Sequence, residues 1–414
     1  MTGQTKLNYI CRPMKQNKNP VIFIFITVLI DCMGIGIIVP VIASIISEVG
    51  HVSVNQATTY GGYMMATYAV MQFVFAPVLG GISDRFGRRP VLLLSLFGLG
   101  CDYLFLALAN TLPLLFVGRV IAGICGASFS TSFAYIADVS PPEKRAQNFG
   151  MMGAAFGLGF IIGPVLGGMF SSFGPRMPFY AAACLSLINW LYGYFILPES
   201  LKPENRRPFD IKRANPFGAF VQLKKSKHIR TLVLSMFLLY LAGQVMPAVW
   251  PFYTKFTYHW TDREIGYSLA FVGVMVSIVQ GGLIKWAKNT FGTVKAVYIG
   301  LAFYFAGLAL MSLANQSWML YAFTFVYSLG GIASPTIQGI LSGRVPANEQ
   351  GELQGMMTAL MSVSTIISPL LMTNLFYFFT RENTPVFFPG APFAAAALLT
   401  LGGAVLCAKG VKES

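Results

Sequence analysis

Long apolar segments of about 20 residues or more recur along nearly the whole chain, separated by short stretches of charged residues, Gly and Pro. A helix of that length spans a hydrocarbon core that is ~30 Å thick. The segments do not alternate apolar and polar residues, as the strands of a membrane β-barrel would. The pattern therefore predicts an all-α membrane protein with twelve transmembrane helices. Their predicted ranges are 21–46, 60–82, 90–109, 112–136, 148–172, 178–197, 230–255, 263–286, 293–313, 316–342, 352–380 and 385–408.

The positions of the charged residues predict which side of the membrane each loop faces. Hydrophobic residues make up 55% of the 414 residues and charged residues only 11%, whereas a soluble domain carries roughly 25% charged residues. Of the 29 Lys and Arg residues, 24 lie in the termini and in the loops after the even-numbered helices. Because Lys and Arg concentrate in cytoplasmic loops, both termini are expected in the cytoplasm. The net charge of +14 then belongs to the surface of a lipid bilayer, and no nucleic-acid partner is expected.

The two halves of the chain are predicted to be repeats of each other. Four separated stretches of the first half match the second half at a constant offset of 205 residues. These pairs are Phe86-Gly87 with Phe291-Gly292, Pro141 with Pro346, Gly150-Met151-Met152 with Gly355-Met356-Met357, and Pro164 with Pro369. The long polar and basic stretch between the halves indicates a cytoplasmic linker. We therefore expect an N-terminal six-helix half at 1–197, a linker at 198–229 and a C-terminal six-helix half at 230–414.

Sequence motifs for several kinds of chemistry are absent. The six cysteines are scattered, form no CxxC pair and lie mostly in apolar segments, so they are expected to act as small apolar residues. The three histidines are far apart in the sequence, and neither a GxxxxGK(S/T) phosphate loop nor an HExxH metal motif occurs. We therefore expect no cofactor, no bound metal and no enzymatic activity.

One loop carries a specific motif. The segment GGISDRFGRRP, residues 80–90, places one carboxylate and three arginines between two apolar segments. Its spacing, Gly-x3-Asp-Arg-x-Gly-Arg-Arg, resembles the loop between helices 2 and 3 of the major facilitator superfamily, whose members are twelve-helix secondary transporters. The resemblance implies parallel six-helix repeats with a substrate site between them, near the middle of the membrane.

The same resemblance implies that this loop is a conformational gate and not a substrate site. Asp84, at the end of the second helix, would face the positive N-terminal end of the helix that starts near Gly351. Asp138, at the end of the fourth helix, would pair with Arg88 or Arg89. These contacts would hold the outward-open state. The predicted gate residues are Gly80, Asp84, Arg85, Gly87, Arg88, Arg89 and Asp138.

A second motif, GFIIGPVLGG, lies in the predicted fifth helix. Small residues at this spacing let helix backbones approach closely, and a proline removes a backbone hydrogen bond and can bend the helix. Gly-rich faces of this kind occur in many membrane bundles. The full string resembles the helix 5 motif of the proton-coupled antiporters in the superfamily, which implies export rather than uptake. The residues of this motif are Gly159, Gly163, Pro164, Gly167 and Gly168.

Only three ionisable residues lie well inside predicted helices, and Asp31, Asp102 and Arg119 all belong to the first half. Charged groups in the hydrocarbon core are costly and by default indicate function. A proton-coupled carrier needs a carboxyl group that alternates between a protonated form, favoured by burial, and an ionised form, favoured by a nearby arginine. We expect Asp31 or Asp102 to carry the coupling proton, with Arg119 controlling its affinity. A static buried ion pair that joins helices 1 and 4 is the alternative.

Within the superfamily, the chain most resembles the tetracycline/proton antiporters. The likeness covers nearly the whole chain except the termini and the linker, and segments such as DCMGIGIIVPVIA, AYIADVSPPEKRAQNFG and GELQGMMTALMSVSTIISPLL carry it. It implies an exporter in a bacterial inner membrane that exchanges a small drug-like compound for protons; we expect it to be monomeric. The membrane histidine and aspartate of the best-known tetracycline exporters align here with Val276 and Phe303. This departure makes a larger, more apolar or cationic compound as much expected as a metal-chelated tetracycline.

Aromatic and amide side chains are the candidates for substrate binding, because a pocket of ring faces and amides suits planar, partly apolar compounds. Three other functions stay open: an exporter of an endogenous metabolite such as a siderophore, an uptake symporter, which the helix 5 motif disfavours, and a transport-inactive membrane sensor or scaffold. A scaffold does not need carboxylates in the membrane core, which favours a carrier. The predicted substrate-binding residues are Tyr68, Gln72, Gln244, Trp250, Gln280, Phe303 and Gln338.

Overall fold

The computed structural model describes residues 20–127, 129–208, 227–346 and 349–412. Its helices form twelve spans that are long and apolar enough to cross a membrane. The first half contains α1 (Pro20–Ile38), α2 (Ile42–Gly50), α3 (Val54–Phe86), α4 (Arg88–Leu108), α5 (Leu112–Gly126), α6 (Phe129–Val139), α7 (Arg145–Phe170) and α8 (Met177–Ile196). The second half contains α9 (Lys227–Gly243), α10 (Val245–Tyr258), α11 (Asp262–Ile278), α12 (Ile284–Phe291), α13 (Thr293–Ser312), α14 (Ser317–Leu329), α15 (Ala333–Gly343), α16 (Gln350–Thr380) and α17 (Ala391–Lys412).

The predicted all-α membrane fold is confirmed, and local signals explain where helix boundaries differ from the predicted ones. The second span begins at Val54 and not at residue 60, because Ser53 and Gln56 form a capping box at its start. The last span begins at Ala391 and not at residue 385. Pro385 and Pro389 lie in the preceding turn, where a proline has no backbone N–H to offer a helix.

Repeated positions in the two halves adopt matching backbone conformations. Gly87 ends α3 with φ +107°, and Gly292, its equivalent at the offset of 205, ends α12 with φ +79°. Glycine adopts positive φ at little steric cost, which explains why a glycine stands at this position in both halves. The predicted boundaries of the two halves and the linker stay predictions, because residues 209–226 of that linker lie outside the described part of the chain.

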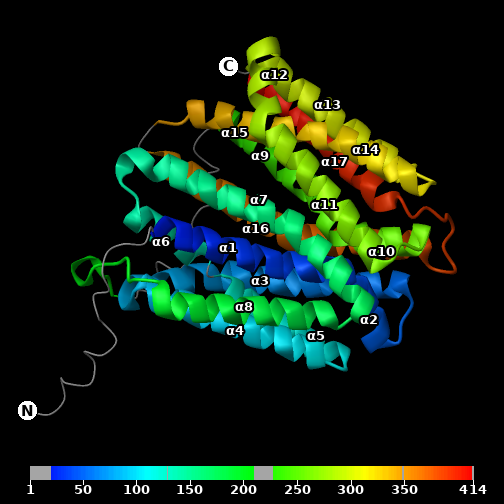
Figure 1. The fold of residues 1–414 in the computed structure, drawn as a ribbon. Helices are drawn as coiled ribbons and strands as arrows, with labels where there is room; N and C mark the ends of the chain where they lie inside the picture. The colour runs from blue at the N-terminus through cyan, green and yellow to red at the C-terminus, as the bar shows by residue number, and fades with distance from the viewer. Residues whose placement is uncertain (1–19, 128, 209–226, 347–348, 413–414) are drawn as a thin grey trace, which may run out of the picture.

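The two halves contact each other through the pairs α7 with α11 and α3 with α16, and α10 also contacts α2 and α3. These contacts concentrate at one end of the bundle. Figure 1 shows α2 and α10 close together there, while α12 and α6 lie far apart at the other end. We call the first the Gly50 end, where α2 stops, and the second the Gly87 end, where α3 meets α4.

Glycines show that the halves are tightly packed at one end only. A Cβ added to Gly62 on α3 would lie 2.0 Å from Thr373 Oγ1 of α16, and one on Gly266 of α11 would lie 2.3 Å from the Pro164 carbonyl oxygen of α7. Nearer the Gly87 end, several glycines of the same four spans have no atom within 4 Å of such a Cβ. These are Gly80, Gly150, Gly153, Gly157, Gly281, Gly282, Gly351 and Gly355. The structure is therefore closed at the Gly50 end and open at the Gly87 end.

Backbone contact between α1 and α7 should make Gly163 sensitive to substitution. A Cβ on Gly163 would lie 2.8 Å from both Gly36 Cα and the Met33 carbonyl oxygen, and backbone atoms yield little. We expect Gly163→Ala to lower the unfolding free energy by about 1–3 kcal/mol through overpacking. Thermal denaturation of the purified protein in detergent measures this. The matched control is Gly153→Ala on the same helix, where the added methyl meets open space; equal losses in both variants would contradict the packing described.

Candidate functional site

The three predicted intramembrane charges lie on three different helices of the first half. Asp31 is on α1, Asp102 on α4 and Arg119 on α5. Arg119 Nη2 lies 3.9 Å from Asp102 Oδ2, and the Asp102 side chain is completely buried. Among the described residues, neither Asp102 oxygen has a hydrogen-bond partner, and Asp31 Oδ1 has none. The loose ion pair therefore joins α4 to α5. The alternative considered from the sequence was an ion pair between the first and fourth predicted helices, which correspond to α1 and to the span of α5.

Asp31 lies among polar side chains inside the first half. The Asn189 amide, from α8, interacts with its carboxyl group and also donates a hydrogen bond to the Thr27 carbonyl oxygen at 3.3 Å. Tyr103 is close enough to Asp31 and Asp102 to interact with both electrostatically. Asn189 was not predicted, although the sequence places an amide within the apolar sixth predicted helix; the structure shows that it is buried.

Two predicted substrate residues lie beside this charge cluster. Gln72 on α3 donates to the Tyr68 hydroxyl at 3.3 Å and to the Gly126 carbonyl oxygen of α5 at 3.2 Å. Tyr68 interacts electrostatically with Arg119 and Asp31. Tyr68 and Gln72 thus connect α3 to the helix that carries Arg119.

The predicted amide residues of the second half are spread over several elements. Gln244, between α9 and α10, donates to Thr365 Oγ1 at 3.3 Å. Gln338 on α15 donates to Gln354 Oε1 on α16 at 3.0 Å. Gln280 is exposed and belongs to the π-helical stretch Val279–Leu283 that joins α11 to α12. The structure does not gather these three side chains into one site.

The two predicted aromatic residues of the second half have different environments. Trp250 is buried and donates to Ser268 Oγ at 2.9 Å, inside an aromatic core with Trp260 and Phe393. Phe303 on α13 is 37% exposed. Packing within its own half therefore occupies Trp250, which does not support the predicted role in substrate binding.

An apolar hollow of about 400 Å³ lies along the seam between the halves, where α3 and α5 face α16. It is lined by Tyr63, Ala66, Thr67, Val70, Met71, Phe116, Ile366 and Leu370. Among the described residues, no three His, Cys, Asp or Glu side chains gather as a metal site requires.

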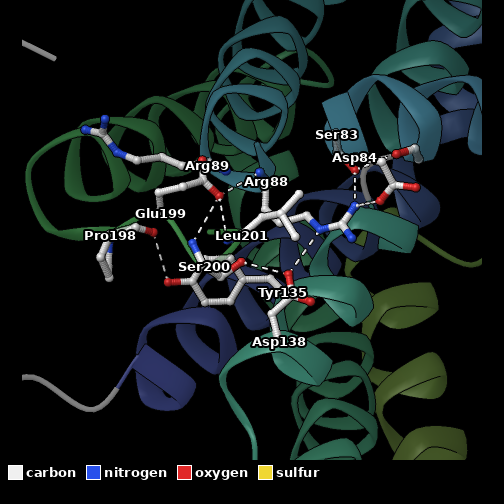
Figure 2. Close-up of polar contacts among 11 residues, drawn as sticks. Ser83, Asp84, Arg88, Arg89, Tyr135, Asp138, Pro198, Glu199, Ser200 and Leu201 are labelled. Carbon is white, nitrogen blue, oxygen red and sulfur yellow. Dashed lines mark hydrogen bonds and ion pairs between the residues drawn. The ribbon is translucent and has the colours of Figure 1, made fainter. Parts of the chain in front are cut away.

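Arg88 is the centre of the polar network at the Gly87 end (Figure 2). Its Nη1 atom lies 2.5 Å from Asp84 Oδ1 and 2.6 Å from Ser83 Oγ, and its Nε atom lies 3.2 Å from Asp138 Oδ2. Asp138 pairs with Arg88, one of its two predicted partners. The pair is formed while the Gly87 end is open, so it is not restricted to the outward-open state that the gate hypothesis assigned to it. Ser200 also donates to Asp138 Oδ2 at 3.1 Å, so the network reaches the start of the linker.

Glu199 caps the first turn of α4, a role that the sequence analysis missed. Its Oε1 accepts the Arg88 backbone N–H at 2.8 Å and its Oε2 accepts the Arg89 backbone N–H at 3.2 Å (Figure 2). A carboxylate at this position satisfies free helix N–H groups and interacts well with the positive helix end. A Cβ on Gly87 would lie 2.2 Å from Glu199 Oε2, so this contact also requires glycine there.

The other two arginines of the predicted gate have different contacts. Arg89 donates to the Tyr194 carbonyl oxygen at 2.7 Å. Arg85 is exposed and lies over the Phe86 ring at 5.0 Å. The predicted contact of Asp84 with the start of α16 is not formed in this open arrangement, because Gly351 faces empty space.

Comparison with known families identifies the chain. A family model described as Major Facilitator Superfamily matches residues 24–292 and 232–413, which together cover almost all of the sequence. The chain belongs to the major facilitator superfamily. Members of this superfamily are transporters and not enzymes, and the twelve spans make this one a multi-pass membrane protein.

Relatives with substantial sequence identity show to which group of the superfamily this transporter belongs. It is 39% identical to the tetracycline resistance protein, class C, of Escherichia coli over 88% of this chain and 91% of the relative. It is 36% identical to the class H protein of Pasteurella multocida over 87% of this chain and 89% of the relative. The transporter therefore belongs with the tetracycline resistance proteins of the superfamily, and the resemblance stated from the sequence is confirmed.

Solved structures agree on the fold of the transporter. The nucleoside transporter NupG superposes with a TM-score of 0.73 at 14% identity, over 95% of this chain and 99% of that one. The human organic anion transporter MFSD10 (TETRAN) gives a TM-score of 0.68 at 22% identity, over 94% and 98%. At these identities the likeness concerns the fold alone.

The Glu199 cap gives a local prediction for this transporter. Glu199→Ala should free the first N–H groups of α4, at a cost of about 1 kcal/mol, typical for loss of a helix N-cap. Hydrogen exchange measured by mass spectrometry should then become faster in the peptide around Arg88. Glu204→Ala changes an exposed carboxylate of the same segment and should leave that peptide unchanged. Equal exchange in both variants would contradict the capping role.

Proposed function

We propose that this transporter is a proton-coupled exporter of small drug-like compounds, of the tetracycline or multidrug type, that works by alternating access. One observation carries the proposal: a buried carboxyl group, Asp102, lies 3.9 Å from an intramembrane arginine, Arg119, with no hydrogen bond among the described residues. The names of its relatives, tetracycline resistance proteins at 34–39% identity, support drug export.

The loose geometry of the Asp102–Arg119 pair suits proton exchange better than a structural role. A buried ion pair that only stabilises a fold needs close contact and further hydrogen bonds to offset the cost of leaving water. At 3.9 Å and without such bonds, the ionised carboxylate depends on the position of Arg119. A small movement of α5 against α4 would decide whether Asp102 is ionised or protonated. This links proton binding to helix arrangement, which is what coupling requires.

Asp31 is the second candidate for the coupling proton. It is 7% exposed, one of its oxygens is unpaired among the described residues, and Asn189 and Tyr103 lie beside it. Asp31 is on α1, the helix that packs along the glycines of α7. A change in its charge would therefore act on the helix that contacts the antiporter motif.

The arrangement of the halves supports a direction of transport. The Gly87 end carries the loops rich in Lys and Arg, which we place in the cytoplasm of a bacterial inner membrane together with both termini. With that orientation, the open Gly87 end admits substrate from the cytoplasm. When this end closes, Asp84 would approach the N-terminal end of α16, as the gate hypothesis states.

The antiporter motif on α7 lies between α1 of the first half and α11 of the second half. Gly159 and Gly163 face Cys32 and Gly36 of α1, and Gly168 faces Arg263 of α11 in the other half. The backbone contacts of Gly159 and Gly163 with α1 should make α1 and α7 move together within the first half. We infer that α7 transmits movement between α1, which carries Asp31, and the second half.

Two observations support the proposed substrate class: the residues that line the hollow between the halves, and the lack of intramembrane charges at the equivalent positions of the second half. The hollow between α3, α5 and α16 is almost wholly apolar. In the second half, Met236, Gly307 and Thr324 stand where the first half has its intramembrane charges. A partly apolar, planar or cationic compound fits such surroundings. An endogenous metabolite of similar chemistry is the second candidate.

Proton movement in proteoliposomes tests the proposal. With an imposed pH gradient, one compound of a panel should dissipate the gradient when the native protein is present. The panel contains tetracycline with magnesium, a lipophilic cation, a fluoroquinolone and an iron-free siderophore. Dissipation should be lost in Asp102→Asn or in Asp31→Asn, since an amide cannot exchange the coupling proton.

The matched control is Glu382→Gln, which removes an exposed carboxylate in the turn before α17 and should behave like the native protein. Dissipation that persists in both aspartate variants would rule out these two residues as coupling sites. A response to the siderophore alone would favour the metabolite exporter.

A further inference from the structure

A polar cluster of three side chains joins the two halves at the Gly50 end. We call Ser44, Lys255 and Asp262 the Ser44 cluster. Lys255 Nζ lies 2.8 Å from Asp262 Oδ1 and donates to Ser44 Oγ at 2.7 Å. Ser44 Oγ in turn donates to Asp262 Oδ1 at 2.5 Å. The three groups thus form a closed triangle of charge-assisted hydrogen bonds, which are among the stronger polar contacts in proteins.

Only one member of the Ser44 cluster comes from the first half. Lys255 lies in the last turn of α10 and Asp262 in the first turn of α11, where each charge complements the helix dipole. A capping box between Thr261 and Glu264 fixes the start of α11. The ion pair is therefore held within the second half. The Ser44 hydroxyl, on α2, is what connects that pair to the first half.

The cluster is partly shielded from water. The Lys255 and Asp262 side chains are only 25% and 12% exposed. Charges that are shielded in this way are screened less by salt than surface pairs. A second polar contact accompanies it at the same end, where Asn55 Nδ2 at the start of α3 donates to the Thr380 carbonyl oxygen of α16 at 3.2 Å.

We propose that the Ser44 cluster is a conformational switch that holds the Gly50 end closed while the Gly87 end is open. This proposal rests on the alternating access proposed above. It identifies the contact that must break before the Gly50 end can open. When the halves separate there, Lys255 and Asp262 stay paired with each other, and the Ser44 hydroxyl exchanges both partners for water. Because one hydroxyl connects the Lys255–Asp262 pair to the first half, its removal shifts the balance between the two states without unpairing a charge.

Distance measurements on labelled protein test the switch directly. Spin labels at Asn110→Cys and Asn315→Cys, in a background without native cysteines, report the separation of the halves at the Gly50 end. Both positions are exposed and lie in turns at that end, one in each half. In Ser44→Ala, the ratio of the long-distance to the short-distance population should rise about tenfold, the factor expected for a hydrogen bond to a charged group.

Two further variants make the test specific. Ser44→Thr keeps the hydroxyl and should retain the native ratio, which separates the switch from a general packing defect. Glu48→Gln is the matched control on the same helix, because Glu48 pairs with Arg176 inside the first half, at 3.3 Å, and does not join the halves. It should also leave the ratio unchanged.

Two results would overturn the proposal. One is an unchanged ratio in Ser44→Ala; the other is a shift of similar size in Glu48→Gln. The label distances are measured without any transport. They therefore test the switch independently of proton coupling. Intact proton-coupled flux together with an unchanged ratio would refute the switch and leave the exporter proposal standing.

Discussion

Close backbone contact at the Gly50 end of the helix bundle holds the two halves of the transporter together. Pro164 and Gly168 of α7 press against Gly266 and Arg263 of α11, and Gly62 of α3 presses against α16. Side chains larger than hydrogen at these glycines would separate the halves. The same four spans carry glycines with free space near the Gly87 end. In the proposed transport cycle, these small residues would let the seam between the halves close at one end or at the other.

The two halves share a fold but divide the chemistry unequally. The first half holds the three intramembrane charges, with Asp31 and Asp102 buried among Tyr, Asn and Arg side chains. The second half has an apolar and aromatic interior, in which Trp250, Tyr253 and Phe393 pack together. We infer that the first half responds to protons, while the second half serves as the rigid partner against which it moves.

Much of the fold could be predicted from the sequence, because membrane spans depend on length and hydrophobicity alone. The equivalence of Gly87 and Gly292 was also predicted from the sequence. Both adopt positive φ, a backbone conformation that favours glycine, so the residue is kept in both halves. The pairing of Asp138 with Arg88 followed from the motif, and the position of Arg119 beside Asp102 did not. Which charges meet across a bundle depends on helix rotation and tilt, and a single sequence leaves both undetermined. Glu199 and Ser44 were missed for the same reason: their partners lie 111 and 218 residues away.

In the proposed transport cycle, the two ends of the bundle open alternately, driven by protons. Two label pairs on one protein test it most directly: Glu143→Cys with Thr290→Cys at the Gly87 end, and Asn110→Cys with Asn315→Cys at the Gly50 end. All four positions are exposed. On acidification in the presence of the compound that dissipates the pH gradient in proteoliposomes, the first pair should shorten in the same fraction of molecules in which the second pair lengthens. A change at one end without the other would contradict it.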